Sequence, residues 1–173
     1  MPTIEPTSSF AVERLRLADM LAACPQLLGR FEAPDAMSAL RDPLEPMKPG
    51  KIHIVAVTVD DHEGLRPYAV IMRPGEEMYG LVAAGDHNYL RRQGTLWVYL
   101  ADNCRYDDPD DDLIDFENFA GGVVDDLAAI AGRGGLLPIH TISWHMPPER
   151  SHPRLDGQDL KPFWDCVVAV QWE

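Results

Sequence analysis

The sequence predicts an α+β protein, with an antiparallel β-sheet and two main helices packed on one of its faces. Segments with the alternating or β-branched apolar residues of strands dominate the middle and the end of the chain. Two longer segments repeat apolar residues at the spacing of amphipathic helices. Helices that cover one face of such a sheet give an α+β fold. The 173 residues fit one domain, expected at 10–173 after a flexible leader at 1–9.

The N-terminal part of the chain is expected to hold a long helix from about Phe10 to Leu28. Serines just before it are candidate caps. Pro25 is expected to stop or kink the helix, because proline lacks the N–H of an interior helix residue. Ala36–Leu40 is predicted to be a short helix with Asp35 as its cap. The prolines at 43–49 indicate an extended connector.

The second main helix is expected over about Leu113–Ala131, where apolar residues recur at helical spacing. Gly121 and Gly122 lie inside it, and each costs roughly 1 kcal/mol relative to alanine. We therefore expect another segment to pack closely there, or the helix to bend. The glycines at 132, 134 and 135 are predicted to end it.

The strands are expected between and after these helices. Lys51–Val59 is apolar on both faces and is predicted to be a central strand. We expect it to form an antiparallel hairpin with Pro67–Met72. Further strands are predicted at Thr95–Ala101, Leu136–Trp144 and Phe163–Trp172.

Two segments lack a clear period. Residues 74–94 are rich in glycine and are predicted to hold a short strand at Tyr79–Ala83, or else to be a long loop. Loops of this length are usually functional or mobile. Residues 147–162 contain several prolines and are predicted to be a polar loop.

The net charge of −13 argues against two classes of partner, nucleic acids and anionic membranes. Nucleic-acid binding through phosphates and binding to an anionic membrane surface both require clustered Lys and Arg. Solubility is the simplest reason for such a charge. No secretory signal and no apolar run of the ~18–20 residues needed to span a bilayer is visible, so we expect an intracellular protein.

The cysteines and tryptophans are expected to be structural. The three cysteines, Cys24, Cys104 and Cys166, are too few and too far apart for a disulfide framework or a zinc knuckle, and we expect reduced thiols. Cys166 alternates with apolar residues and is expected in the core. The same alternation places Trp164 and Trp172 in the core, although an aromatic ligand patch is the alternative.

Metal sites are weighed against simpler interpretations. The acidic run at 107–115 has the carboxylates that Ca²⁺ or Mg²⁺ prefers, but it lacks the glycine and closing glutamate of an EF-hand. Acids before a helix also cap its N–H groups and favour its dipole, and we prefer this interpretation. His140 and His145 fall on opposite faces of a continuous strand, so they cannot share a metal without a bulge. A site with Glu149 and His152 stays open.

No complete catalytic set is visible. Ser143 and His145 share one face of a predicted strand, but no orienting acid accompanies them. Arg105 would lower the pKa of the neighbouring Cys104 thiol, whereas the surrounding acids would raise it. The glycines do not follow the strand–glycine–helix order of nucleotide-binding motifs. We therefore expect no enzyme, no cofactor and no metal.

The order of elements suggests a family. The helix sequence RLADMLAACPQLLGRF precedes the strand sequences KIHIVAVTV, RPYAVIMRPG and GTLWVYL. The helix sequence DFENFAGGVVDDLAAIAG and the final strands LPIHTISWH and FWDCVVAVQWE follow. This layout resembles the small tail-terminator, or tail-completion, proteins of long-tailed bacteriophages and prophages. The resemblance covers most of the chain and lies in element order, without an invariant motif.

The resemblance implies a structural function. Such proteins form a ring, typically hexameric, that caps the growing tail tube and joins it to the head. The partners would be other copies of the chain, tail-tube proteins and head–tail connector proteins, in the cytoplasm during assembly and later in the virion tail. An acidic ring lumen would repel DNA and let it pass. The candidate assembly contacts are Tyr79, Tyr89, Arg91, Arg92, Arg150 and Arg154.

Two other classes of function stay open. One is an enzyme or small-ligand binder with a site under loop 74–94 that uses His140, Arg91 or Tyr89. The other is a dimeric regulatory or adaptor module.

Overall fold

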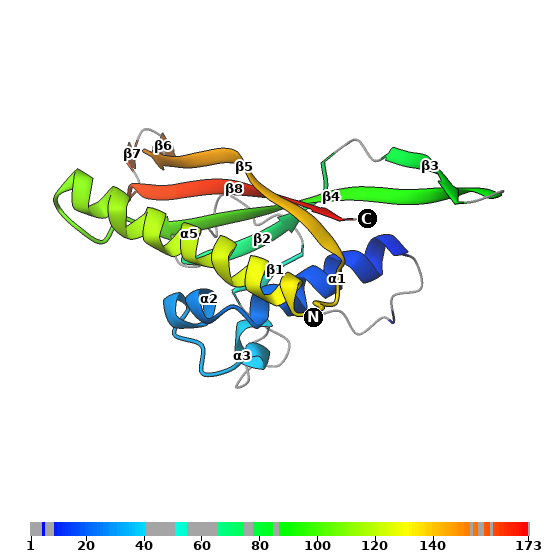
Figure 1. The fold of residues 1–173 in the computed structure, drawn as a ribbon. Coiled ribbons are helices and arrows are strands. Elements are labelled where there is room, and N and C mark those ends of the chain that lie inside the picture. Colours follow the sequence, from blue (N-terminus) through cyan, green and yellow to red (C-terminus); the bar gives the residue numbers. More distant parts are fainter. Residues whose placement is uncertain are drawn as a thin grey trace.

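The helices of the chain lie on one face of a β-sheet (Figure 1). A computed structural model describes residues 5, 9–40, 51–54, 66–74, 78–84, 87–152, 154–155, 158–159 and 161–172. The helices are α1 (Ser9–Ala22), α2 (Pro25–Arg30), α3 (Ala36–Leu40) and α5 (Pro109–Gly132). The strands are β1 (Ile52–His53), β2 (Tyr68–Met72), β3 (Met78–Ala84), β4 (His87–Asn103), β5 (Ile139–Ser151), β6 (Arg154–Leu155), β7 (Gln158–Asp159) and β8 (Phe163–Trp172).

The sheet has the strand order β1-β2-β4-β8-β5, and β3 pairs with the outer part of β4. Its pairs are antiparallel except β1 with β2, so the sheet is mixed. The predicted α+β class is confirmed. The short strands β6 and β7 pair with each other in a separate ribbon.

The predicted helix Phe10–Leu28 is two helices. Helix α1 ends at Ala22, and Pro25 starts α2 at a position where a missing N–H costs nothing. The predicted stop at Pro25 is therefore confirmed. The short helix Ala36–Leu40 is also confirmed, and Asp35 caps it by accepting a 2.8 Å hydrogen bond from the backbone N–H of Ser38.

Helix α5 begins four residues before the predicted Leu113, because the acidic run caps it. Asp108 is the N-cap, and its carboxylate accepts hydrogen bonds from the N–H groups of Asp110 and Asp111. At the other end the chain leaves the helix through Gly134, whose φ of +83° suits glycine. The capping interpretation of these acids is confirmed.

Helix α2 packs closely across α5. A Cβ atom added at Gly122 would lie 2.7 Å from Cγ of Gln26, whereas one at Gly121 would meet nothing within 4 Å. The N–H of Gln26 donates a 2.9 Å hydrogen bond to the carboxylate of Asp126 on α5. The predicted close packing is confirmed at Gly122.

The main core fills the space between the helices and the sheet. Trp164, Trp172 and Cys166 of β8 belong to it, as predicted. Other fully buried members are Leu17, Leu21, Leu27, Ile71, Leu96, Val98, Leu100, Phe116 and Leu127. Since strand residues alternate between faces, Tyr68, Val70, Ala101 and Phe163 form a second, smaller cluster on the far face of the sheet.

The prediction for the first strand is wrong in two respects. The described part, β1, is an edge strand and not a central one, and it runs parallel to β2, so the antiparallel hairpin is absent from this pair. Residues 55–65 lie outside the described residues. Ile52 is buried although β1 is at the edge, because the Lys51 N–H bonds the Ala39 carbonyl (2.9 Å) and holds the strand against the helices. The connector 43–49 also lies outside the described residues.

The predicted loop 147–162 is partly wrong as well. Strand β5 continues through Pro147 and Pro148 to Ser151. Two features explain this: β5 is an edge strand, and its register on β8 shifts between Trp144 and Met146 and again before Glu149. An edge strand tolerates prolines where no ladder hydrogen bond is needed.

Candidate functional site

A two-stranded ribbon extends from the sheet. In β4, residues Gly94–Asn103 pair with β8, whereas His87–Gln93 pair with β3. The pairing runs from Met78 opposite Gln93 to Ala84 opposite His87. Figure 1 shows this ribbon projecting past the helices at one end of the molecule. The predicted short strand at Tyr79–Ala83 is confirmed and is longer than expected, and the long-loop alternative is wrong.

The base of the ribbon is marked by Gly94. This residue pairs with Trp172, the last residue of β8, and a Cβ atom at Gly94 would lie 2.1 Å from the indole ring. Only glycine leaves room for that ring, which is buried in the main core. Gly94 thus stands where the pairing of β4 changes from β8 to β3.

The ribbon combines apolar residues with cations. The described strands, 78–84 and 87–93, contain Arg91 and Arg92 and no Asp or Glu, whereas Glu76, Glu77 and Asp86 stand beside these strands in the sequence. The register places Leu81 opposite Leu90 and Val82 opposite Tyr89. A two-stranded ribbon is at best marginally stable by itself in water.

The structure brings four of the six predicted contact residues into this ribbon. Tyr79 pairs with Arg92, Gly80 with Arg91, and Tyr89 lies further out on β4. Arg154 is in β6, outside the main sheet. Arg150 is half-buried on β5, opposite Trp164. The alternative of a ligand site under loop 74–94 assumed a loop there, whereas the described part of this segment is the β3–β4 ribbon.

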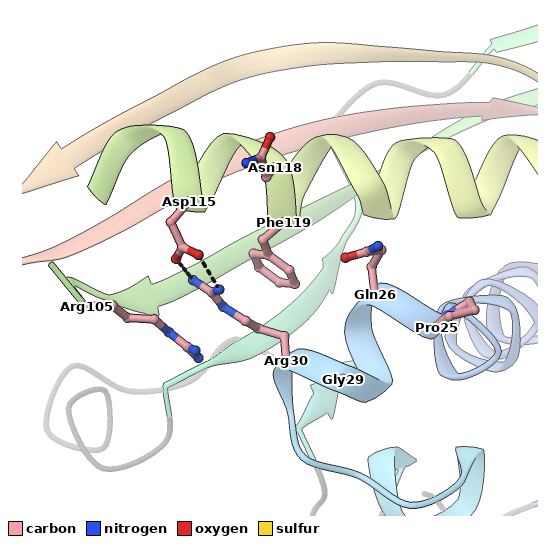
Figure 2. A pocket seen from close by; sticks show the side chains of 8 residues that line it. All are labelled: Pro25, Gln26, Gly29, Arg30, Arg105, Asp115, Asn118 and Phe119. Carbon is pink, nitrogen blue, oxygen red and sulfur yellow. Dashed lines mark hydrogen bonds and ion pairs between the residues drawn. The ribbon is translucent and has the colours of Figure 1, made fainter. Parts of the chain in front are cut away.

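A polar cleft of about 370 Å³ lies between α2 and α5 (Figure 2). It is lined by Pro25, Gln26, Gly29, Arg30, Arg105, Asp115, Asn118 and Phe119. Sequence analysis missed it, since α2 and α5 are far apart along the chain and no motif links them.

Arg30 is the centre of the cleft. Its Nη1 and Nη2 atoms donate to the two oxygens of Asp115, at 3.2 and 2.5 Å, and its Nε donates to Asp102. The guanidinium also lies over the Phe119 ring, 5.0 Å from the ring centre. Arg105 donates from Nε to the same Asp102 oxygen, at 3.1 Å. Two carboxylates thus balance the two cations, and the cleft has little charge left to attract an ion.

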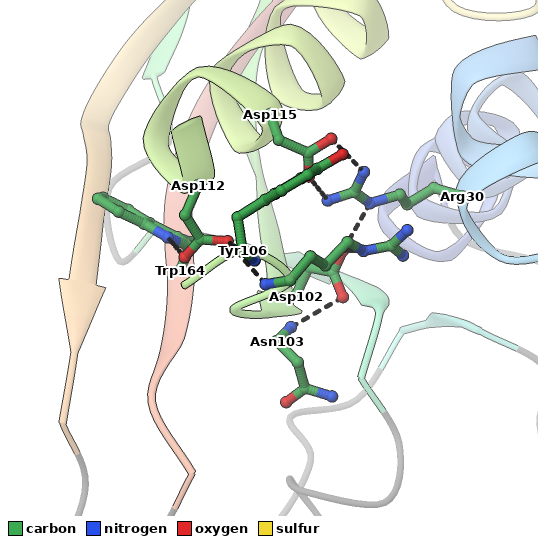
Figure 3. Close-up of polar contacts among 8 residues, drawn as sticks. Arg30, Asp102, Asn103, Tyr106, Asp112, Asp115 and Trp164 are labelled. Carbon is green, nitrogen blue, oxygen red and sulfur yellow. Dashed lines mark hydrogen bonds and ion pairs between the residues drawn. The ribbon is translucent and has the colours of Figure 1, made fainter. Parts of the chain in front are cut away.

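Asp112 organises the neighbouring loop (Figure 3). Its Oδ1 accepts from the backbone N–H groups of Arg105 (2.6 Å) and Tyr106 (3.0 Å), and its Oδ2 accepts from Trp164 Nε1 (2.7 Å). Burial alone would raise the pKa of Asp112, but these bonds and one from Cys104 outweigh it and lower the pKa to about 2. The side chain is 1% exposed and serves the fold.

The candidate metal and catalytic residues do not converge. Within the described residues, no group of three or more His, Cys, Asp or Glu side chains is placed to hold a metal ion. His140 and His145 themselves lie at register shifts of β5, between Ile139 and Thr141 and between Trp144 and Met146, so the simple alternation expected there fails. The His145 ring stacks on Trp97 with ring centres 4.1 Å apart.

Cys104 is not activated. Burial raises the pKa of its thiol, and the bond to Asp112 raises it further. The expectation that Arg105 would lower it is wrong, because the guanidinium of Arg105 turns to Asp102. None of the eight residues that line the cleft is a Ser, Cys or His, so the cleft holds no nucleophile–base pair.

Comparison with known proteins adds no identification. Neither the protein-family models nor the curated proteins include a match to this chain. No described helix has the length and apolarity needed to cross a membrane.

Proposed function

We propose that this protein is a structural assembly subunit, which forms a homo-oligomeric ring and acts as the tail terminator of a phage or prophage. In that role it would contact tail-tube and head–tail connector proteins and would end in the virion tail. The proposal draws on the resemblance in element order and on the projecting ribbon.

The ribbon is the observation that carries an assembly function. Seven residue pairs, from Met78–Gln93 to Ala84–His87, extend past the point where β8 ends. At about 3.3 Å per residue this arm is roughly 20 Å long. It is held to the rest of the chain at its base, and it carries apolar residues together with two arginines. A second protein molecule that covers the arm would supply the burial that a lone hairpin lacks.

A ligand-binding function is the second candidate. The cleft around Arg30 has a volume within the usual range of ligand sites, about 300–1,000 Å³. Its lining offers amides at Gln26 and Asn118, but its arginines are already paired. A small amide or carboxylate ligand would have to compete with Asp115 for Arg30. This cost favours the assembly function.

Electron microscopy of the purified full-length chain tests the proposal. Closed rings with a central opening are expected. A matched variant replaces Met78–Gln93 by a two-residue Gly-Asn turn, which keeps the Met72–Trp97 pair at the base of the hairpin. This variant should keep the far-ultraviolet circular dichroism of a folded chain and lose the rings.

The control is Met37→Ser, which removes an exposed apolar side chain from α3 (54% exposed) and should leave the rings intact. Compact particles without an opening, for the unaltered chain at every concentration, would contradict the proposal.

A further inference from the structure

The last part of β5 is a separate paired segment from which the chain enters β6. Beyond the register shift between Met146 and Glu149, three residue pairs remain between β5 and β8, from Glu149–Asp165 to Ser151–Phe163. The chain passes from these pairs into β6 and returns from β7 to β8. Figure 1 shows β6 and β7 at this end of the sheet. We call the three residue pairs the root of the β6–β7 strand pair.

The first pair of the root sets two carboxylates opposite each other. Glu149 and Asp165 are register partners, and the side chains of directly opposite residues share one face of a sheet with Cβ atoms about 4.5–5.5 Å apart. Like charges in this position weaken the pairing of antiparallel strands. Glu149 is exposed, whereas Asp165 is half-buried. Since burial disfavours a charged carboxylate, Asp165 gains from taking up a proton.

Asp165 lies among groups from three strands on the far face of the sheet. Tyr99 of β4 donates its hydroxyl to Oδ2 at 2.9 Å, and Ser151 of β5 donates to Oδ1 at 3.5 Å. Arg66, which precedes β2, is the positive charge that acts on Asp165. Tyr68 of β2 packs against Tyr99, with ring centres 6.1 Å apart. The carboxylate is thus tied to its neighbours on both sides of β8.

The balance of these groups favours the protonated form of Asp165. Burial raises the pKa of Asp165 above its ordinary value of 3.8, and the charge of Glu149 raises it further. The hydrogen bonds from Tyr99 and Ser151 and the charge of Arg66 lower this pKa, but they do not outweigh the other two causes. The proton therefore stabilises the folded chain in acid, and this contribution is lost as the pH rises from 3.8 through the raised pKa.

We propose that Glu149 and Asp165 form a proton-sensitive brace at the root of the β6–β7 strand pair. With both carboxylates ionised, their repulsion weakens the last three pairs of β5 and β8. When Asp165 takes up a proton, its O–H group donates to Glu149 and the root closes. The brace does not rest on the ring function. It sets how firmly the sheet holds the segment with β6, which carries Arg154.

Hydrogen exchange of backbone amides tests the brace. Protection factors, which divide out the intrinsic pH dependence of exchange, would be measured by NMR on the full chain at pH 7 and pH 4. The amides of the root should be about two- to fivefold better protected at pH 4, which is the effect of removing one like-charge pair between strands. The pairs from Thr141–Gln171 to Trp144–Val168, beyond the register shift, are the internal reference and should change less.

Two variants should remove the pH dependence. Glu149→Gln and Asp165→Asn each exchange one carboxylate for an amide of the same shape, which ends the repulsion. In both variants the root should be as well protected at pH 7 as at pH 4. Glu117→Gln is the matched control: it makes the same change in net charge at an exposed site on α5 and should keep the pH dependence of the unaltered chain.

The carboxyl carbon of Asp165 gives a second readout. Its NMR titration midpoint should move to lower pH in Glu149→Gln, because the charge of Glu149 raises the pKa of Asp165 in the unaltered chain. The midpoint should stay unchanged in Glu117→Gln.

Root protection that is the same at pH 7 and pH 4 in the unaltered chain, or that varies equally in Glu149→Gln, would overturn the brace. Either result would leave the ring function standing, because electron microscopy observes the rings separately.

Discussion

Trp164 and Asp112 join the last strand to the second main helix through one buried hydrogen bond, 2.7 Å from Nε1 to Oδ2 (Figure 3). The other oxygen of Asp112 holds the backbone of Arg105 and Tyr106. One carboxylate thus fixes the start of α5 on the sheet. The position of the Arg30 cleft, which α5 lines, depends on this anchor.

Asp112→Asn should lower the free energy of unfolding by roughly 2–3 kcal/mol. The amide keeps the shape of the side chain, but its NH₂ group faces donors and leaves buried groups unpaired. Urea denaturation measures the loss. Asp111→Asn is the matched control: Asp111 is exposed in the same turn, and its change should cost at most about 1 kcal/mol through the helix dipole. Equal losses in the two variants would show that Asp112 is not the anchor.

The stabilisation by Asp112 should disappear in acid. The folded chain holds the pKa of Asp112 at about 2, below its ordinary value of 3.8. A group with a depressed pKa stabilises the fold above its unfolded pKa, and this contribution is lost as the pH falls through the folded pKa. The difference in unfolding free energy between the unaltered chain and Asp112→Asn should stay constant from pH 7 to 5. It should shrink by roughly 2 kcal/mol between about pH 4 and 2.

The comparison with Asp112→Asn is needed because Asp165 titrates in the opposite sense. Burial raises the pKa of Asp165, so this group favours the folded state as the pH falls. A difference that stays flat down to pH 2 would contradict the role given to the hydrogen bonds of Asp112.

Arg30 and Asp115 should be strongly coupled. Arg30→Met leaves Asp102 buried, with a side chain 2% exposed, and with Arg105 as its remaining ion-pair partner among the described residues, so a loss of about 2–3 kcal/mol is expected. Asp115→Ala should cost less, because that side chain is 24% exposed. A double-mutant cycle by urea denaturation should give a coupling energy of at least about 0.5 kcal/mol. If the losses in unfolding free energy of the two single variants simply add up in the double variant, the paired hydrogen bonds between Arg30 and Asp115 add no stability.

The two glycines inside α5 should respond differently to alanine. Gly121→Ala fills open space and should stabilise the protein by about 0.5–1 kcal/mol through helix propensity. Gly122→Ala gains the same propensity but pushes against the side chain of Gln26, so its net effect should be smaller or of opposite sign. Thermal denaturation of the pair measures the difference. An equal rise in Tm for both variants would show that α2 yields at this contact without cost.

Local signals in the sequence account for much of the fold. Pro25 ended the first helix, the acids before Leu113 capped the second, and Gly122 marked a close contact, each through the chemistry of one residue or its near neighbours. The apolar alternation of Phe163–Trp172 also predicted which of its residues are buried.

The misjudged elements depended on distant partners. The apolar residues at the start of Lys51–Val59 indicated a central strand, but β1 lies at the edge of the sheet. A run of apolar residues shows that a strand is buried, and it does not show whether neighbouring strands or helices bury it. Arg30 in the cleft pairs with Asp102 and Asp115, which are 72 and 85 positions away, and no short motif encodes such a set. Sequence analysis identified the tyrosines and arginines of the ribbon as candidate contacts. Their position on one ribbon follows only from the register of β3 on β4.

The absolute mass of the purified chain in solution, measured by light scattering over a concentration series, tests the assembly function most directly. A mass that rises with concentration toward one fixed multiple of 19.3 kDa, and a shift to lower mass when Met78–Gln93 is replaced by the short turn, are the predicted results. A strict monomer of 19.3 kDa at every concentration, with or without the ribbon, would contradict the proposal that this protein builds a ring through its projecting arm.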